Sequence, residues 1–175
     1  MTYLLIIALL FVAELLYFRI ADKYNIIDKP NQRSSHTQIT LRGGGIIYWI
    51  VALFYAAIHF SAFSAWFFAG MTLISLVSFW DDIKGLGQKV RLLFHLLAMT
   101  CAFQAAEVFG AYPWWAVIIG YIVFIGIVNA YNFMDGINGI TGLYSIAVLV
   151  SLGWVNEYVQ AFTSADFIVY PLLAS

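Results

Sequence analysis

The sequence predicts an all-α integral membrane protein: a polytopic helix bundle with about six complete transmembrane helices and a partial seventh. Of its 175 residues, 63% are hydrophobic and only 10% are charged. The mean hydropathy is +0.90, far above that of a soluble domain. The apolar residues also fall in runs of close to the ~20 residues that a helix needs to cross a bilayer. The single cysteine, Cys101, excludes a disulfide framework within the chain.

The apolar runs give the expected elements in chain order. A seventh run begins near residue 161 and reaches Ser175 before a full crossing is complete. We expect residues 1–175 to form one transmembrane domain, the amino-terminal half of a larger protein. The complete spans are predicted at roughly 1–20, 44–60, 62–80, 90–109, 113–131 and 141–155.

The basic residues predict the orientation of these spans. They lie at or within the first loop and directly after the third span: Arg19, Lys23, Lys29, Arg33, Arg42, Lys84, Lys89 and Arg91. Basic loops face the cytoplasm, so both clusters are predicted there and the amino terminus outside. A signal peptide is the alternative for the first run, but that run lacks a basic segment ahead of it.

An acid pair closes the third span in the stretch "SFWDDIKGLGQKVR". Asp81 and Asp82 lie where the helix dipole is already negative, so a compensating cation is expected. Lys84, Lys89 and Arg91 can supply it, which makes the stretch an ordinary charged membrane edge. The alternative is a Mg²⁺ site, because this ion prefers hard oxygen ligands together with substrate phosphates.

A polar stretch, "NAYNFMDGINGITG", follows the fifth span on the same predicted face. Asn129, Asn132 and Asp135 recur every three residues, so a helical continuation places them on one face. Three glycines with the same spacing follow, and the next span begins with free backbone N–H groups that favour an anion. An ordinary Asn/Gly-rich turn is the alternative; it explains the glycines but not two regular triplets.

The first loop, "DKPNQRSSHTQITLRGGG", combines Arg33, His36 and Arg42 with Gly43 to Gly45. Guanidinium groups match phosphate oxygens and histidine can donate to them, so the segment is typical of an anion-binding mouth. No nucleotide P-loop pattern is present. The alternative is ordinary basic loop chemistry, which leaves the three glycines unexplained. Together, the three loops predict phosphoryl transfer between a lipid-borne phosphate and a soluble, phosphate-rich donor.

These three motifs, in this order and topology, resemble those of the polyprenyl-phosphate N-acetylhexosamine-1-phosphate transferases, a glycosyltransferase family 4 type of enzyme. The resemblance runs through the whole chain and is closest to the branch that initiates O-antigen and exopolysaccharide synthesis. The family is related to phospho-N-acetylmuramoyl-pentapeptide transferase. It implies a multi-pass protein of the bacterial cytoplasmic (inner) membrane with its active face toward the cytoplasm.

The resemblance also implies the reaction and its partners. Undecaprenyl phosphate attacks a UDP-N-acetylhexosamine, which gives a polyprenyl diphosphate sugar and UMP and begins a cell-envelope polysaccharide such as that of lipopolysaccharide. The implied cofactor is Mg²⁺, with Mn²⁺ as its substitute. Membrane lipid surrounds the protein, no nucleic acid is involved, and a homodimer is left open. The sugar and the polysaccharide are not indicated by the sequence.

The resemblance assigns roles to residues of the three motifs. Asp81, Asp82 and Asp135 are implied as catalytic, and Asp82, Asn132 and Asp135 as metal ligands. Whether an aspartate acts as base or nucleophile stays open, because a phosphate monoester, with a second pKa of about 6, is already largely deprotonated at neutral pH. Substrate binding is implied for Arg33, His36, Arg42, Gly43, Gly44, Lys84, Lys89, Arg91, Asn129, Asn132 and Asn138.

The chain departs from the family pattern in three ways. Leu41 replaces a usual proline before "RGGG", and Asn138 replaces a frequent second aspartate. Family members have about ten or eleven spans, and their later loops contribute another aspartate and a histidine-rich motif. We therefore expect this chain alone to lack full activity. A CDP-alcohol type of phosphotransferase is disfavoured, because its Asp/Gly/Ala-Arg pattern is absent.

A non-catalytic transporter or lipid-phosphate-binding subunit is the alternative from another functional class. It predicts polar residues deep inside several spans, where they would line a pathway. Glu14 and His95 are the main candidates, and a packed or interfacial position is the simpler interpretation of both.

Overall fold

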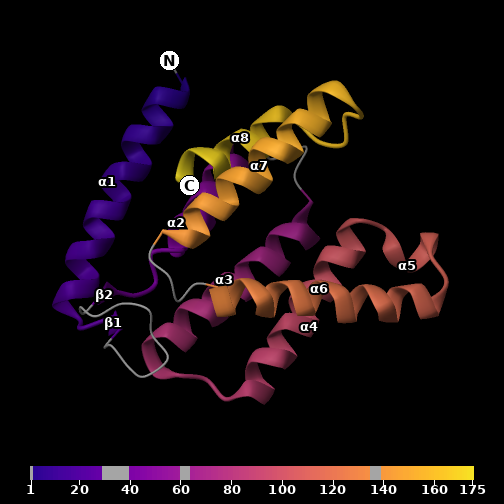
Figure 1. Cartoon of the computed structure of the whole chain (residues 1–175), viewed down its shortest axis with the longest axis horizontal. Coiled ribbons are helices and arrows are strands. Elements are labelled where there is room, and N and C mark those ends of the chain that lie inside the picture. The colour runs from indigo at the N-terminus through magenta and orange to yellow at the C-terminus, as the bar shows by residue number, and fades with distance from the viewer. Residues whose placement is uncertain (1, 29–39, 60–63, 135–138) are drawn as a thin grey trace. The chain divides into compact units, whose positions relative to one another are not determined.

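The computed structural model describes residues 2–28, 40–59, 64–134 and 139–175 (Figure 1). The described residues form eight helices, so the predicted all-helical fold is confirmed. A pair of two-residue antiparallel strands, β1 (Ile27–Asp28) and β2 (Thr40–Leu41), was not predicted. The helices are α1 (Thr2–Lys23), α2 (Ile46–Ile58), α3 (Ala65–Lys84), α4 (Gln88–Ala105), α5 (Val108–Ala111), α6 (Trp114–Met134), α7 (Ile140–Tyr158) and α8 (Ala165–Ala174).

Three of the described helices are long and apolar enough to cross a membrane. They are α1 over Tyr3–Lys23, α6 over Trp114–Phe133 and α7 over Ile140–Tyr158. The apolar helix α2 has only 13 residues, which at about 1.5 Å per residue is shorter than a ~30 Å hydrocarbon layer. Charged residues occupy the last turn of α3 and the first turn of α4. Six complete spans therefore stay a prediction, although every predicted span coincides with a helix.

The chain divides into two compact units. The first combines residues 1–58 with residues 134–175 and contains α1, α2, α7, α8 and the strand pair. Its core includes the ring of Tyr55, which meets Phe167 and Tyr170 with centroids 5.4 and 5.8 Å apart. Asn156 is buried at the end of α7, where its side-chain oxygen accepts the N–H groups of Phe162 and Thr163. This amide therefore shapes the turn that leads into α8.

The second unit covers residues 59–133 and is built on the hairpin of α3 and α4. The two helices approach so closely at Gly70 that a Cβ on this residue would lie 2.7 Å from the carbonyl oxygen of Ala98. Small residues at such a crossing are common between membrane helices. Cys101 lies at the same crossing as a free, partly exposed thiol, with its Cβ 3.1 Å from that position.

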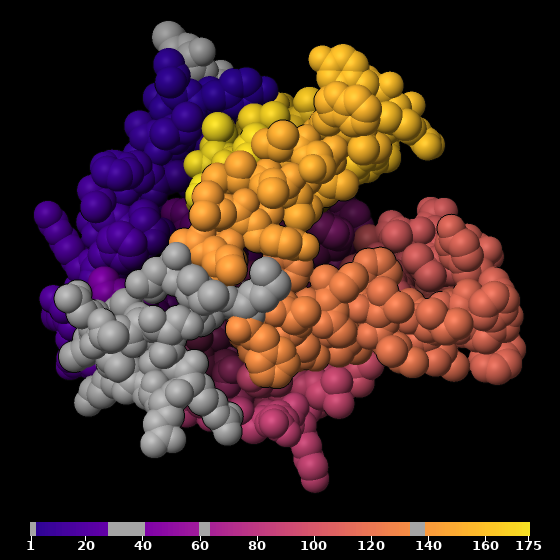
Figure 2. Space-filling model, in the orientation of Figure 1, coloured from indigo at the N-terminus to yellow at the C-terminus, as the bar shows by residue number. Residues whose placement is uncertain are grey.

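Helix α6 packs on α4 through aromatic rings. Phe103 meets Tyr121 and Phe124 with ring centroids 4.8 and 5.9 Å apart, and the hydroxyls of Thr100 and Tyr121 lie 2.7 Å apart. The rest of α6 keeps large apolar side chains exposed, as a helix in contact with lipid must. Figure 2 shows α6, coloured from salmon to orange along its length, at the surface of the face drawn. The packed contact and the exposed remainder together suit a helix at the lipid boundary.

Candidate functional site

The acid pair lies in the last turn of α3, as the sequence predicts. The helix ends because Gly85 adopts a positive φ of 68°, and its N–H donates to the backbone carbonyl of Asp81 over 2.8 Å. The three residues from Gly85 to Gly87 then connect α3 to α4. This short turn brings the acid pair close to the basic first turn of α4.

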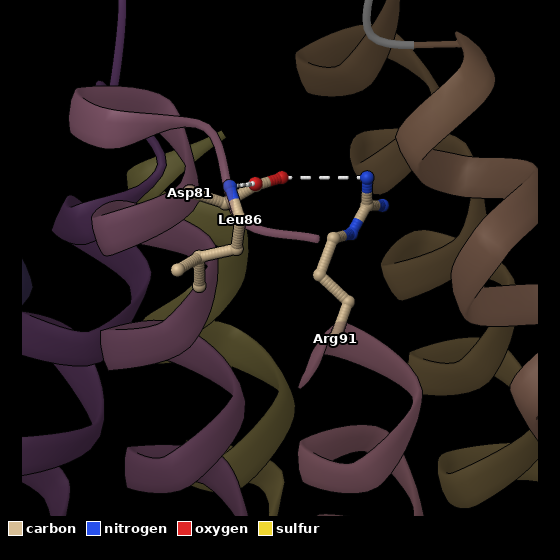
Figure 3. A network of polar contacts seen from close by, with 3 residues as sticks. All are labelled: Asp81, Leu86 and Arg91. Carbon is tan, nitrogen blue, oxygen red and sulfur yellow. Dashed lines mark hydrogen bonds and ion pairs between the residues drawn. The ribbon is translucent and has the colours of Figure 1, made fainter. Parts of the chain in front are cut away.

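The carboxylate of Asp81 makes two contacts across this turn (Figure 3). One oxygen, Oδ1, accepts the N–H of Leu86 over 2.5 Å, and the other, Oδ2, lies 3.3 Å from Nη1 of Arg91. Both side chains of this ion pair are about three-quarters buried. Arg91 therefore supplies the cation that the sequence predicts beside the acid pair, at least for its first member.

The other charged residues of the turn are more exposed. Asp82, Lys84 and Lys89 all lie at the surface. The Nζ atom of Lys84 sits over the ring of Trp80, 5.9 Å from its centroid, and Trp80 itself is 55% exposed. A lysine and a tryptophan in this arrangement are typical of a membrane–water boundary, where each has an apolar body and a polar end. The pairing of Lys84 with Trp80 was missed, although their i, i+4 spacing indicates it.

The polar stretch after the fifth predicted span begins inside α6. The helix continues through Asn129 and Asn132, as the triplet spacing predicts, and ends at Met134. Asn129 is partly buried and its Nδ2 donates to the carbonyl of Ile125, whereas Asn132 is exposed. Two further residues of this predicted site, Asp135 and Asn138, lie outside the described residues. The structure therefore describes this stretch only as far as Met134 and again from Gly139.

The first loop is described only at its two ends. Arg33 and His36 lie outside the described residues, while Arg42 follows β2 and its N–H donates to the carbonyl of Ile26 over 3.0 Å. The hydroxyl of Tyr17 on α1 donates to the carbonyl of Arg42. The main chain of Arg42 is thus bonded to Ile26, directly before β1, and to α1.

Two of the three loop glycines have a structural reason. Gly43 has a positive φ of 81°, which disfavours other residues. A Cβ on Gly44 would lie 3.2 Å from Oε1 of Glu14 on α1, whereas one on Gly45 would meet nothing within 4 Å. The backbone conformation accounts for Gly43 and the close packing for Gly44, so their role in binding an anion stays a prediction.

The predicted site residues fall into both units. Asp81, Asp82, Lys84, Lys89, Arg91, Asn129 and Asn132 belong to the second unit, and Arg42, Gly43 and Gly44 belong to the first. Within the second unit, an ion pair connects Asp81 with Arg91. Among the described residues, no group of three or more His, Cys, Asp or Glu side chains could hold a metal ion. The predicted metal set includes Asp135, which lies outside them.

The glycine that ends α3 gives a direct test of the turn geometry. Gly85→Ala should lower stability by about 1 kcal/mol, because a positive φ costs a residue with a Cβ roughly that much. Gly87→Ala is the matched control, since Gly87 has a φ of −66° and a Cβ there would meet nothing within 4 Å. Thermal unfolding in detergent should show a drop of about 2–4 °C for the first variant only. Equal midpoints for the two variants would contradict this account of the turn.

Comparison with known proteins adds the family context of this site. The profile of glycosyl transferase family 4 matches residues 64–174, which include α3, α4 and the acid pair. The chain is similar to an undecaprenyl-phosphate alpha-N-acetylglucosaminyl 1-phosphate transferase of Thermotoga maritima, with 28% identity over 158 residues. That alignment covers 87% of this chain and 50% of the relative, so the chain spans about half the length of this curated protein. No solved structure matches the chain.

Proposed function

The chain belongs to glycosyl transferase family 4, and we propose that the protein transfers N-acetylhexosamine 1-phosphate from a UDP-sugar to undecaprenyl phosphate. The products are a polyprenyl diphosphate sugar and UMP, and the sugar begins a cell-envelope polysaccharide such as O-antigen or exopolysaccharide. The name of the Thermotoga maritima relative supports the lipid acceptor and makes N-acetylglucosamine the first sugar to test. The observation that carries the proposal is the acid pair beside the basic turn of α3 and α4, within the residues that the family profile matches.

The charges beside the apolar helices support a proposed location. We place the protein in the bacterial inner membrane with the α3–α4 turn and the end of α6 at the cytoplasmic face. Lys84, Lys89 and Arg91 support this orientation, because basic residues next to membrane helices favour the cytoplasm. The Trp80 ring beside Lys84 supports a boundary position for the turn. This face is where a soluble nucleotide sugar and a lipid phosphate can both arrive.

The proposed reaction exchanges one phosphoanhydride bond for another. An oxygen of the lipid phosphate bonds to the sugar-bearing phosphorus, and the bond from that phosphorus to the bridging oxygen breaks. The electron pair of the broken bond leaves with UMP. The attacking monoester has a second pKa of about 6 and is largely ionised at neutral pH, so no strong base is needed. Catalysis then depends mainly on position and charge neutralisation.

The basic residues of the α3–α4 turn suit this task. Lys84 and Lys89 are exposed and can reach phosphate oxygens, while a guanidinium such as that of Arg91 has five N–H donors, of which those on Nη1 face Asp81. In the proposal these three groups hold the phosphates of the two substrates and offset their charge as the new bond forms. Arg33, His36 and Arg42 of the first loop, with Gly43 and Gly44, would shape the entry for the nucleotide sugar.

The oxygen ligands fit a hard divalent cation. Asp82 and Asn132 are exposed and belong to the same unit, and their carboxylate and amide oxygens are the ligand types that Mg²⁺ prefers. In the proposal they hold Mg²⁺, or Mn²⁺ in its place, together with Asp135. When bound, the ion would neutralise charge on the diphosphate of the donor. Asn129, whose amide donates to Ile125, would support Asn132 from the preceding turn, and Asn138 would contact the nucleotide sugar.

The proposal is tested by the nucleotide that the complete gene product releases in detergent. With UDP-N-acetylglucosamine, undecaprenyl phosphate and Mg²⁺ we expect UMP, and we expect its release to stop when the lipid is omitted or EDTA is added. Asp135→Ala should reduce release to background. Other UDP-N-acetylhexosamines then identify the sugar. Lipid phosphate binding without release of UMP from any of these donors would overturn the proposal and favour a binding or transport protein.

A further inference from the structure

We infer that the two members of the acid pair have different tasks: Asp81 is a positioning residue that holds Arg91 and the α3–α4 turn, and Asp82 is the member that faces the ligands. The inference rests on the proposed function for the identity of those ligands. It also narrows the expectation from the family resemblance, in which both aspartates are catalytic.

Among the described residues, the polar contacts of Asp81 join the end of α3 to the α3–α4 turn and to the start of α4. Its backbone carbonyl accepts the N–H of Gly85, its Oδ1 accepts the N–H of Leu86, and its Oδ2 pairs with Arg91. Asp81 thus accepts the capping N–H of Gly85, holds Leu86 in the turn and joins α3 to the first turn of α4. A side chain that is about three-quarters buried in these contacts is already oriented in the absence of substrate.

The charge next to Asp81 disfavours a metal ion on it. The Nη1 atom of Arg91 lies 3.3 Å from Oδ2, so a divalent cation bound to that oxygen would stand within a few ångströms of a permanent positive charge. Contact with Oδ1 would instead compete with the Leu86 N–H. Either position requires the turn to lose a contact that it now has.

Asp82 lies in a different environment. Successive residues on a helix point about 100° apart, so Asp82 projects away from the direction in which Asp81 meets the turn. Its side chain is exposed, while that of Asp81 is mostly buried. Exposure leaves Asp82 accessible to a soluble cation or to a substrate phosphate bridged by one.

Arg91 gains its orientation from this arrangement. A guanidinium has five N–H donors in a rigid plane, and contact with one carboxylate oxygen leaves several of them available. Because Asp81 holds one edge of the group, the remaining donors keep a fixed direction. Asp81 therefore acts on a phosphate only through Arg91.

The first experiment measures coupling between Asp81 and Arg91 without any ligand. Thermal unfolding of the complete gene product in detergent with EDTA is compared for Asp81→Asn, Arg91→Gln and the double variant. Asparagine keeps an oxygen for the Leu86 N–H but loses the charge. We expect the unfolding midpoint of the double variant to equal roughly that of the less stable single variant, because the effects of substitutions at two contacting residues do not add. Fully additive shifts would overturn the positioning role.

The second experiment measures which aspartate meets the metal. Binding of Mn²⁺ is followed by the electron paramagnetic resonance of the free ion, with UDP-N-acetylglucosamine present. We expect Asp82→Asn to weaken Mn²⁺ binding about tenfold or more, and Asp81→Asn to change it less than about twofold. The opposite order, or equal losses, would overturn the assignment.

Kinetics separate this inference from the proposed function. If the unmodified protein releases UMP, Asp81→Asn should raise the KM for undecaprenyl phosphate, and Arg91→Lys should keep more activity than Arg91→Gln because it keeps the positive charge. If the unmodified protein releases no UMP, the proposed function fails. The unfolding experiment still decides whether Asp81 and Arg91 act as a unit.

Discussion

Replacing Asp82 by asparagine is expected to lower the turnover of the complete gene product about 100-fold or more. The change keeps the shape of the side chain but removes the exposed negative charge that would hold the cation at the donor diphosphate. Loss of one electrostatic group at a reacting centre typically costs 10²–10³ in rate, which sets this magnitude. The measurement is the rate of UMP release at saturating UDP-N-acetylglucosamine, undecaprenyl phosphate and Mg²⁺.

The matched control is Asp22→Asn. Asp22 is also an exposed aspartate in the last turn of a helix, in this case α1. Its loss should leave turnover within about twofold of the unmodified protein, since a surface change away from a site has little effect. A comparable rate for Asp82→Asn and Asp22→Asn would remove Asp82 from the proposed site.

The second large effect is expected at the crossing of α3 and α4. Gly70→Ala would place a Cβ 2.7 Å from the backbone carbonyl oxygen of Ala98, closer than such atoms can approach. The two helices must separate to admit the methyl group, and overpacking of this kind costs about 1–3 kcal/mol. The midpoint of thermal unfolding in detergent should fall by roughly 3–10 °C. The transfer activity of the protein should fall as well, because the α3–α4 hairpin contains the acid pair.

Two other glycines of the same unit serve as comparisons for Gly70→Ala. A Cβ on Gly126 of α6 would meet nothing within 4 Å, so Gly126→Ala should leave the midpoint unchanged or raise it slightly. A Cβ on Gly120 would lie 3.0 Å from the ring of Phe103, which can rotate, so an intermediate effect is expected. If Gly70→Ala proved as harmless as Gly126→Ala, the close packing of α3 on α4 would be wrong.

The helices could be predicted from the sequence because their cause is local. A long apolar run with few breakers folds as a helix in lipid whatever its neighbours do, and α6 and α7 lie where the runs predict them. The strand pair could not be found in this way. Two residues on each side give no periodic pattern, and Ile27 pairs with Leu41 across a segment that lies outside the described residues.

At the candidate site, the sequence likewise predicts the acid pair but not which basic residue it contacts. Its place at a helix end and its need for a cation follow from the helix dipole and from the two carboxylates. Three basic residues were equally suitable partners in the sequence, and the choice of Arg91 depends on the turn conformation that Gly85 sets. The exposed position of Lys84 over Trp80 likewise depends on side-chain geometry. The family resemblance, drawn from the motifs themselves, is confirmed.

The central claim, transfer of a sugar phosphate and not of a sugar alone, is tested most directly with UDP-N-acetylglucosamine labelled with ³²P at the β-phosphate. The complete gene product is incubated with this donor, undecaprenyl phosphate and Mg²⁺, and the lipid and aqueous phases are then separated. We predict label in the lipid phase, as the sugar-bearing phosphate of a polyprenyl diphosphate, with an equal amount of unlabelled UMP in the aqueous phase. Label that appears as UDP, with an unlabelled glycolipid, would contradict the account.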